Sequence, residues 1–537
     1  MLSQGEQAKE ETAAERAVYL IEKRQVFSRS LLWDLQQNYF LEMGVEAWRQ
    51  GEVPHYITSN SAIANSYAEI VFAFLQDSNR LDVGNKYNDE PLCLCELGAG
   101  SGRFAFHFLS RLARLCELAE VPLTSFRYIL TDFTQKNLDF WRSSSRFQPF
   151  FESGVLDVAL FDINRSEHLA LQLSGKTITS GSLNRPLVVI TNYVFDSIPQ
   201  ELFYINDQHC HQCLISLSVS EDPDTLATAE LLERVQYHYD YEALGDAPYQ
   251  EPYLQQLLAD YQRTMTDTHL LFPAAGLRCL QRLRALSKQG LLSLSADKGD
   301  HRLSALQGMS SPTLICHGSF SLSVNYHAFK TFCERSGGLA LFPISHCPNL
   351  NVSCLLMLAG ANDYVETIRA YKRHVQDFGP DDFFTITRFA RQYVAEMRVE
   401  HILAYLRLSY YDSHQLGRYL SRLMELAHEL NPDERRAVSN AIDKVWELYF
   451  PLGEDLDLAY QIACLLYEMD DYAQALTYFE RSIEIYGEHA GTLYNLAACH
   501  QLMGQSVRAE ALLRKLLKYD PGNQQAVALL AETTNKR

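Results

Sequence analysis

Short apolar runs alternate with amphipathic segments through the middle of the chain. The apolar runs cover residues 92–96, 128–131, 156–161 and 187–191, with a polar residue at or just after the end of each. An amphipathic segment over residues 103–118 follows the first run. Apolar runs separated by helical segments are typical of a parallel sheet that is buried on both faces. The pattern therefore predicts an α/β domain with a doubly wound sheet.

The alternation is interrupted once and then resumes. Residues 220–285 are rich in Tyr and Leu at helical spacing, and they predict a helical insertion that serves as a substrate or lid element. Residues 291–295, 319–326 and 351–358 predict the remaining strands. We therefore expect one α/β domain over residues 91–360.

The segment before this domain has a helical pattern. Charged and apolar positions alternate at helical spacing over residues 8–50, and a second helix follows Ser59 or Asn60, either of which suits an N-cap. Residues 1–90 are therefore predicted to form a helical cap. Its expected core contacts are Phe40, Met43, Val45 and Trp48.

The tail beyond the sheet is wholly helical in pattern and contains an internal repeat. A shift of 34 residues superposes Tyr460 on Tyr494, together with the small residues at the expected helix crossings, and this is the period of the tetratricopeptide (TPR) repeat. Two repeats and a half-repeat are visible in residues 455–537. Because stacked repeats need about three units to bury a common core, residues 361–454 are expected to extend or cap them. The tail is predicted to be an all-α, TPR-like solenoid that binds a protein or peptide.

Composition and charge narrow the classes of function. The chain has 47% hydrophobic and 21% charged residues, as soluble globular proteins have, and a net charge of −19 from 47 basic and 66 acidic residues. That balance disfavours nucleic acid as the main partner. The first 30 residues lack the apolar core of a signal peptide and no apolar run reaches 18 residues, so we expect a cytoplasmic protein without membrane contact. The oligomeric state is left open.

One group of cysteines raises a metal hypothesis. The 12 cysteines are scattered along the chain, as expected of reduced intracellular thiols. The run His-Cys-His-Gln-Cys at residues 209–213 offers zinc ligands, but a structural zinc site usually takes four ligands from two paired segments, and the sequence has no second pair. The alternation around this run favours a β-hairpin that turns at Asn206 and Asp207. We therefore expect no bound metal.

The most informative run is Glu-Leu-Gly-Ala-Gly-Ser-Gly-Arg at residues 96–103, directly after the first apolar run. A dinucleotide fold spaces its glycines as GxGxxG, whereas this run is acidic-x-G-x-G-x-G. Glycine lets the chain turn at positive φ and lets the backbone approach a ligand closely. The acidic residue attracts a cationic group, and S-adenosylmethionine (SAM) carries an ammonium and a sulfonium. The run resembles motif I of the class I SAM-dependent methyltransferases and predicts SAM as the cofactor.

Other strand ends are expected to contribute if SAM is bound, because ligands of open α/β sheets lie beyond the carboxyl ends of the strands. Asp132 is expected to accept hydrogen bonds from both ribose hydroxyls, with Phe133 on the adenine face. Asp162 is expected to accept a hydrogen bond from the adenine amino group, and the backbone of Ile163 is expected to recognise the adenine ring.

The carboxylate of SAM also needs donors. We expect Thr58, Ser59 and Asn60 to hold it, helped by Arg103. For each residue assigned to SAM, Asp132 and Asp162 included, a turn or a helix cap is the alternative role when the residue is taken alone. The complete predicted cofactor set is Glu96, Gly98, Ala99, Gly100, Gly102, Arg103, Asp132, Phe133, Asp162, Ile163, Asn192, Thr58, Ser59 and Asn60.

The methyl acceptor is predicted to lie at the end of the fourth strand. Methyl transfer is an in-line displacement, so the protein must mainly hold the acceptor about 3 Å away in a dry pocket. Asn192, Tyr193 and Asp196 stand where groups that orient the acceptor or take its proton belong, and they are the predicted catalytic residues. The alternatives are that Asp196 caps a helix and that Tyr193 packs in the core.

Four segments together resemble a known family. They are residues 96–103, residues 192–203 (Asn-Tyr-Val-Phe-Asp-Ser-Ile-Pro-Gln-Glu-Leu-Phe), residues 295–299 and residues 321–329. In this order they are similar to the MidA-like SAM-dependent methyltransferases, over about residues 40–360. The resemblance implies a Rossmann-like class I methyltransferase core with an insertion. It also implies a protein substrate, because relatives of that family assist the assembly of respiratory complex I by methylating a protein arginine.

Departures from the family pattern leave the acceptor open. The family has Glu where Tyr193 stands, and Asp-Tyr-Gly and Val-Asp-Phe where residues 297–299 and 324–326 read Asp-Lys-Gly and Val-Asn-Tyr. The leading prediction is a SAM-dependent methyltransferase acting on a protein side chain, an arginine or another nitrogen, that the TPR segment recruits. A catalytically silent scaffold and a small-molecule methyltransferase are the alternatives.

Overall fold

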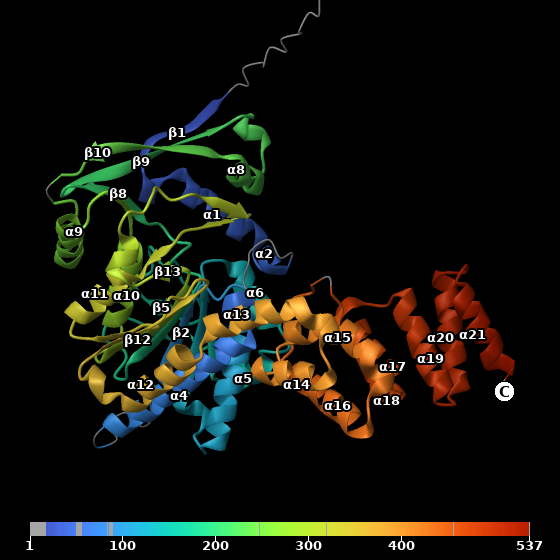
Figure 1. The fold of residues 1–537 in the computed structure, drawn as a ribbon. Coiled ribbons are helices and arrows are strands. Elements are labelled where there is room, and N and C mark those ends of the chain that lie inside the picture. The colour runs from blue at the N-terminus through green and yellow to red at the C-terminus, as the bar shows by residue number, and fades with distance from the viewer. Residues whose placement is uncertain are drawn as a thin grey trace, which may run out of the picture. The chain divides into compact units, whose positions relative to one another are not determined.

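The computed structural model describes residues 18–49, 56–82, 84, 90–245, 247–317, 319–454 and 456–535. The chain divides into two compact units, each with its own sheet (Figure 1). The first unit consists of Met1–Met43, Asp196–Leu277 and Asp300–Phe329. The second unit consists of Gly44–Phe195, Arg278–Gly299 and Lys330–Arg537.

A seven-stranded sheet is the centre of the second unit. Its strands lie in the order β17 (Leu339–Leu341), β18 (Asn351–Leu358), β12 (Gly290–Asp297), β7 (Leu187–Asn192), β2 (Leu92–Leu97), β3 (Phe126–Asp132) and β4 (Leu156–Leu160). The strands from β12 to β4 pair in parallel, whereas β18 is antiparallel to both of its neighbours. The α/β class predicted from the sequence is confirmed.

The sheet is covered on both faces, which explains the continuous apolar runs of its strands. Successive residues of β2 face opposite sides of the sheet, and all six are buried. Leu94 belongs to the core that helices α4 (Ser61–Leu81) and α5 (Arg103–Leu118) cover. Its neighbour Cys95 lies close to Cys279 of helix α10 (Ala274–Ala285).

The order of the strands reverses beside β2. Strands β3 and β4 follow on one side of β2, whereas β7 and β12 follow on the other. Connections that leave a sheet in opposite directions open a crevice between the carboxyl ends of the two strands, and ligands bind there. The loops after β2 and β7 therefore mark the place where a ligand is expected.

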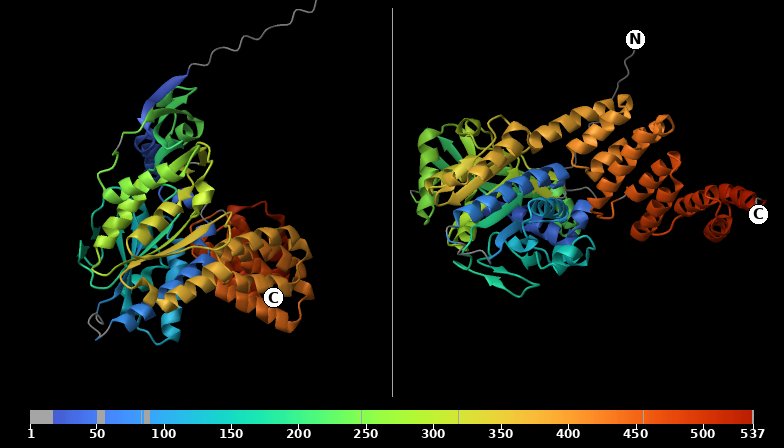
Figure 2. Two further views of the ribbon diagram at one scale, coloured as in Figure 1. Left: turned by 60° about the vertical axis from the view of Figure 1, so that its left-hand side comes forward. Right: turned by 90° about the horizontal axis from the view of Figure 1, so that it is seen from below.

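Helices make up the rest of the second unit. After β18 come α12 (Val365–Tyr371), α13 (Pro380–Ala390), α14 (Val399–Leu408), α15 (Ser413–Leu426) and α16 (Pro432–Glu447). They are followed by α17 (Leu458–Glu468), α18 (Tyr472–Tyr486), α19 (Ala490–Leu502), α20 (Ser506–Tyr519) and α21 (Gln524–Asn535). From α17 onward each helix contacts the next in chain order (Figures 1 and 2), so the predicted all-α tail is confirmed. None of the helices in the described ranges is long and apolar enough to cross a membrane.

The first unit is built on an antiparallel sheet. Strand β9 (His209–Val219) pairs with β1 (Tyr19–Val26), β8 (Glu201–Asn206) and β10 (Gln236–Ala243), and β8 also pairs with β11 (Thr268–Phe272). Strands β8 and β9 form the hairpin that the sequence predicts. Among the residues that the structure describes, no group of His, Cys, Asp or Glu could hold a metal ion. The helices of this unit include α1 (Leu31–Met43), α8 (Thr228–Arg234) and α9 (Pro252–Thr264).

Two local predictions are wrong, and one needs an addition. Within the predicted N-terminal helices, Tyr19–Val26 forms strand β1, whose charged residues are accommodated because its side chains are only partly buried. Residues 319–326 are not one strand of the main sheet, since helix α11 (Tyr326–Arg335) begins inside them and Asn325 Oδ1 accepts from the backbone N–H of Ala328 at 3.0 Å. The insertion predicted at residues 220–285 contains strands β10 and β11 besides helices α8 and α9.

Candidate functional site

The three glycines of the loop after β2 all have left-handed backbone conformations. The angle φ is +60° at Gly98, +55° at Gly100 and +77° at Gly102, a region that residues with a Cβ avoid. The N–H of Gly102 donates to the carbonyl of Ala99 at 2.9 Å, which closes the turn. Helix α5 begins at Arg103, directly after the loop. Glycine is therefore required at these positions, at the switch point of the sheet.

Two tryptophans lie against this glycine loop. A Cβ on Gly100 would come within 2.8 Å of Cζ2 of Trp48, which belongs to helix α2 (Glu46–Arg49). A Cβ on Gly102 would come within 3.0 Å of Trp141, and the indole N–H of Trp141 donates to the carbonyl of Gly100 at 3.0 Å. An alanine at position 100 would therefore have to displace the Trp48 indole.

Glu96 is buried at the end of β2. Its Oε2 accepts a hydrogen bond from Tyr128 Oη at 2.6 Å. Burial raises the pKa of Glu96 to about 8; the hydrogen bond from Tyr128 opposes this shift and the nearby Asp132 carboxylate adds to it. With these neighbours the carboxyl group is mostly protonated at pH 7. Strongly perturbed buried acids concentrate at functional sites, and a cation placed beside Glu96 would lower its pKa and ionise it.

Asp132, at the end of β3, joins the glycine loop to the start of helix α6 (Gln135–Ser143). Its Oδ2 accepts from the N–H of Gly100 at 3.2 Å and from Asn137 Nδ2 at 3.0 Å, and its Oδ1 accepts from the N–H of Thr134 at 2.9 Å. Burial raises the pKa of Asp132, and these hydrogen bonds oppose the shift. A carboxylate accepts about four hydrogen bonds, so these three contacts already occupy most of its acceptor positions, and the contact with both ribose hydroxyls stays a prediction.

Asn192 ends β7, on the other side of the switch point. Its Oδ1 accepts from Tyr67 Oη of α4 at 3.0 Å. Its Nδ2 is buried and finds no hydrogen-bond partner among the described residues. Leaving a buried donor unpaired costs about 1–3 kcal/mol, so a ligand group that accepted from this amide would recover that cost. Burial raises the pKa of Tyr67, and Asp297, buried at the end of the adjacent β12, adds to the shift.

Tyr193 follows in a strained conformation. Its φ is +54°, which is unusual for a bulky side chain, and its N–H donates to the carbonyl of Ala296 at 3.0 Å. Strained backbone of this kind is concentrated at functional sites, which supports the predicted place of the acceptor. Asp196 belongs to the first unit, where it is buried and accepts from Ser197 Oγ at 2.7 Å. The catalytic roles assigned to these residues stay predictions.

Asn60 has the N-cap role that the sequence predicts for Ser59 or Asn60. Its two amide N–H groups donate to the carbonyls of Tyr56 and Ile57, at 2.9 and 3.1 Å. Its Oδ1 accepts from the N–H groups of Ala62 and Ile63, at 3.0 and 3.1 Å. Asn60 is thus the N-cap of α4, and both of its side-chain N–H groups are used there, while its contact with the carboxylate of SAM stays a prediction.

The other residues predicted to hold that carboxylate are buried as well. Thr58 and Ser59 lie in helix α3 (Tyr56–Ser59), directly before α4. Arg103 forms an ion pair with Glu454, and its Nη1 lies 2.9 Å from Nε2 of His414. The structure therefore directs the Arg103 guanidinium toward the tail segment, a partnership that the sequence does not predict.

The residues predicted to read adenine lie at the ends of β3 and β4. Asp162 Oδ1 accepts from the N–H of Asn164 at 2.8 Å, as in a turn, and the carbonyl of Ile163 accepts from Arg282. Phe133 follows Asp132 and is partly exposed. Asp162 thus has the turn-forming role that was its alternative, while its contact with adenine stays a prediction.

Four residues join the site that the sequence analysis does not assign to it. Asp297 carries a signal, because it follows the predicted strand at residues 291–295 just as Asp132 follows its own strand. Trp48 is predicted only as a core contact, and no local pattern marks Trp141 or Tyr67. These three come from helices, so only the packing of the second unit places them beside the strand ends.

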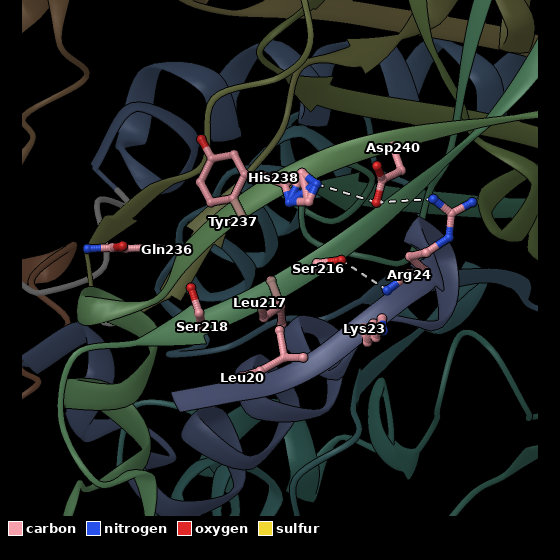
Figure 3. A pocket seen from close by; sticks show the side chains of 10 residues that line it. All are labelled: Leu20, Lys23, Arg24, Ser216, Leu217, Ser218, Gln236, Tyr237, His238 and Asp240. Atoms are coloured by element: carbon pink, nitrogen blue, oxygen red, sulfur yellow. Dashed lines mark hydrogen bonds and ion pairs between the residues drawn. The ribbon is translucent and has the colours of Figure 1, made fainter. Parts of the chain in front are cut away.

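A separate hollow lies in the first unit. It has a volume of about 360 Å³ and is lined by residues of β1, β9 and β10 (Figure 3). Figure 3 shows Arg24 and His238 directed at Asp240, whose Oδ2 lies 3.3 Å from Arg24 Nη1 and 3.3 Å from His238 Nε2. Arg24 and His238 thus share one carboxylate, and none of the predicted site residues lines the hollow.

A family model for the tetratricopeptide repeat matches residues 466–533. Residues 466–533 are a tetratricopeptide segment. This confirms the repeat that the period of 34 residues predicts. No curated protein matches the chain.

Solved structures similar to this chain include two from Burkholderia thailandensis. One is an uncharacterized COG1565 superfamily protein, with 12% identity and a TM-score of 0.39, covering 64% of this chain and 90% of that chain. The other is a COG1565 superfamily member bound to S-adenosyl-homocysteine, with 14% identity and a TM-score of 0.40, covering 64% of this chain and 90% of that chain. The α/β sheet and the all-α tail that the sequence predicts are confirmed as the fold.

Proposed function

We propose that this protein is a SAM-dependent methyltransferase. The observation that carries the proposal is the pairing, at one switch point, of a left-handed glycine loop with a buried amide donor that has no partner among the described residues. In the register of the sheet Leu97 pairs with Thr191, so Gly98 and Asn192 leave the sheet at the same level. A ligand in this crevice would meet both.

The residues of this crevice fit the groups of SAM. Glu96 and Asp132 are acids suited to an ammonium and to a ribose hydroxyl, and the glycines let a ligand approach the backbone. We retain Ala99, Phe133, Asp162, Ile163, Thr58 and Ser59 as proposed cofactor contacts. SAM supplies a methyl group that its sulfonium activates. Asn192, Tyr193 and Asp196 are proposed to orient the acceptor and to take its proton.

The proposed acceptor is a nitrogen of a protein side chain, arginine or another, recruited through the TPR segment. TPR solenoids present extended surfaces that bind peptides and proteins, which supports a protein substrate. The neutral Tyr193, where the resembling family has a carboxylate, favours no single amino acid as acceptor. We place the protein in the cytoplasm, and we keep the proposed division into a cap (1–90), a core (91–360), a helical linker (361–454) and repeats (455–537).

A catalytically silent scaffold is the second candidate, and one contact favours it. The indole of Trp48 lies against Gly100, the central glycine of the loop, where a bound ligand would also approach the backbone. If a ligand cannot displace this indole, the protein folds without binding SAM. Its function is then protein binding by the repeats.

Isothermal titration with S-adenosylhomocysteine (SAH), the demethylated product of SAM, separates these candidates. Gly100→Ala introduces both a left-handed alanine and a clash with Trp48, whereas Gly154→Ala introduces the same kind of strain at φ +72° with no atom within 4 Å of the new Cβ. We expect the wild type and Gly154→Ala to bind SAH equally, and Gly100→Ala to bind it at least tenfold more weakly.

Transfer of a tritiated methyl group from SAM identifies the class of acceptor. Label in lysate proteins supports the proposal, whereas label found only in a metabolite extract identifies a small-molecule methyltransferase. The absence of SAH binding, together with no label in either fraction, would falsify the proposed activity and leave the scaffold.

A further inference from the structure

The segment between α16 and α17 lies against both sides of the glycine loop. We call this segment, residues 449–454, the strap. Its last residue, Glu454, stands 351 residues after its partner Arg103. The strap therefore brings the tail of the second unit to the strand ends of the sheet.

Phe450 anchors the strap in the core. It is 1% exposed, and its ring centroid lies 5.3 Å from those of Phe106 and Phe147 and 6.4 Å from that of Phe140. The N–H of Phe106 donates to the carbonyl of Gly102 at 3.0 Å, and Phe147 is one of the residues that a Cβ on Gly102 would meet. The aromatic ring of the strap is thus packed on the first turn of α5, directly behind the loop.

Glu454 compensates the positive charge of Arg103, the first residue of α5. Arg103 is 3% exposed, and Glu454 and His414 surround its guanidinium. Burial tends to raise the pKa of Glu454, but Arg103 and the hydrogen bonds at this carboxylate hold it below its ordinary value. Removing one carboxylate partner from a buried guanidinium weakens the compensation of its charge. The position of Arg103, and with it the end of the glycine loop, therefore depends on the strap.

Helix α2, which lies against the glycine loop, also contacts the strap. Arg49 Nε donates to the carbonyl of Leu452, and Arg49 Nη1 pairs with Glu46 at 2.6 Å. Trp48, the residue before Arg49, lies against Gly100. One short segment thus holds the helix that carries Trp48 and the helix that follows Gly102.

The strap also contacts the repeats. Tyr449 Oη lies 3.1 Å from the Oη of Tyr486, the last residue of α18. Tyr486 Oη also donates to the carbonyl of Leu456 at 3.1 Å, just beyond the strap. Helix α18 lies within the residues that match the TPR model. Contacts therefore lead without interruption from a repeat helix to the glycine loop.

We propose that the strap couples the repeat segment to the SAM site, with Glu454 and Phe450 as positioning residues for the glycine loop. The proposal rests on the proposed function, because SAM is the ligand whose affinity the strap controls. A protein bound to the repeats changes that affinity by moving Tyr486. Coupling is reciprocal. A ligand bound at the glycine loop must therefore change how often the strap and α18 unfold locally.

Hydrogen exchange of the full wild-type chain tests this reciprocity with SAH as the probe. We expect saturating SAH to slow amide exchange in the glycine loop, in the strap and in the C-terminal half of α18. Exchange in strand β10 of the first unit serves as the internal reference and is expected to stay unchanged.

Two isosteric substitutions test the positioning role. Glu454→Gln removes the charge that faces Arg103, and Glu447→Gln removes an exposed charge from the end of α16. We expect SAH to bind Glu454→Gln at least tenfold more weakly and Glu447→Gln as it binds the wild type, while Glu454→Asp recovers part of the affinity. At saturating SAH, Glu454→Gln should still protect the loop but no longer the strap, a result that a merely structural role would not produce.

The outcomes separate this inference from the function on which it rests. If the wild type binds no SAH, the proposed function fails. If SAH binds but leaves exchange in the strap and α18 unchanged, the coupling is refuted, even where Glu454→Gln does not fold. Equal SAH affinity of Glu454→Gln and the wild type would refute the positioning role.

Discussion

The raised pKa of Glu96 predicts that removing its charge stabilises the fold at alkaline pH. Burial raises this pKa from its ordinary value of 4.5 to about 8. A group with a raised pKa in the folded state contributes stability that is fully present below pH 4.5 and is lost as the pH rises to about 8. A glutamine side chain does not titrate, so the Glu96→Gln variant escapes this loss.

The expected size follows from the two pKa values. Between pH 5.5 and pH 9, ionisation of Glu96 lowers the free energy of unfolding of the wild type by roughly 3 kcal/mol relative to the variant. The amide introduced by Glu96→Gln adds N–H donors beside Tyr128, which costs about 1–2 kcal/mol at every pH. The difference between variant and wild type should therefore change from slightly destabilising at pH 5.5 to stabilising at pH 9.

Urea unfolding of the full chain at pH 5.5 and pH 9 measures this difference. Tryptophan fluorescence is a suitable signal, because Trp48 and Trp141 both contact the glycine loop. Glu117→Gln, which changes a carboxylate with 68% of its side chain exposed, is the matched control and should show no such trend. A difference for Glu96→Gln that is the same at both pH values would refute the reasoning.

Three further predictions concern the same unit. Binding of SAH at pH 7 should release close to one proton, because the ammonium ionises Glu96; titration in buffers of different ionisation enthalpy measures it, and a heat independent of buffer contradicts it. Asn192→Ala should lower the rate of methyl transfer at least tenfold, whereas Tyr67→Phe should not. Both substitutions remove the hydrogen bond between these two residues, but only Asn192→Ala also removes the unpaired Nδ2 donor. Equal losses for the two variants in a methyl-transfer assay would refute a role of the Asn192 amide. Burial lowers the pKa of His107 from 6.5 to about 4, so stability should fall by roughly 3 kcal/mol between pH 6.5 and pH 4. His107→Asn should remove that part of the pH dependence in urea unfolding, and an unchanged profile would count against the burial of His107.

The strand ends are the part of the site that the sequence predicts well. Each buried strand is a local apolar run, and a polar residue after such a run lies at the ligand edge of a parallel sheet whatever the rest of the chain does. The glycine loop is predictable for the same reason, since its spacing and its left-handed φ values are local properties. The same rule predicts a site position for Asp297, which follows the apolar run at residues 291–295.

The partners of these residues are not predictable in this way. The position of Arg103 after the glycine loop predicts a donor for a ligand carboxylate. In the structure Arg103 instead pairs with Glu454, which lies far along the chain. Asn60 reads as a ligand for the same carboxylate, but its amide is consumed by the helix start beside it. Strand β1 escapes detection because it is only partly buried and lacks a clear alternation, so pairing with β9 rather than its own pattern determines its structure.

Photolabelling with radioactive SAM tests the central claim most directly, because it locates the ligand without requiring the acceptor. Full-length protein is irradiated with the label, digested with trypsin and mapped by mass spectrometry. We expect label in the peptide that ends at Arg103 and contains the glycine loop, and we expect excess SAH to prevent this labelling. Label confined to peptides of the first unit, or no label that SAH displaces, would contradict it.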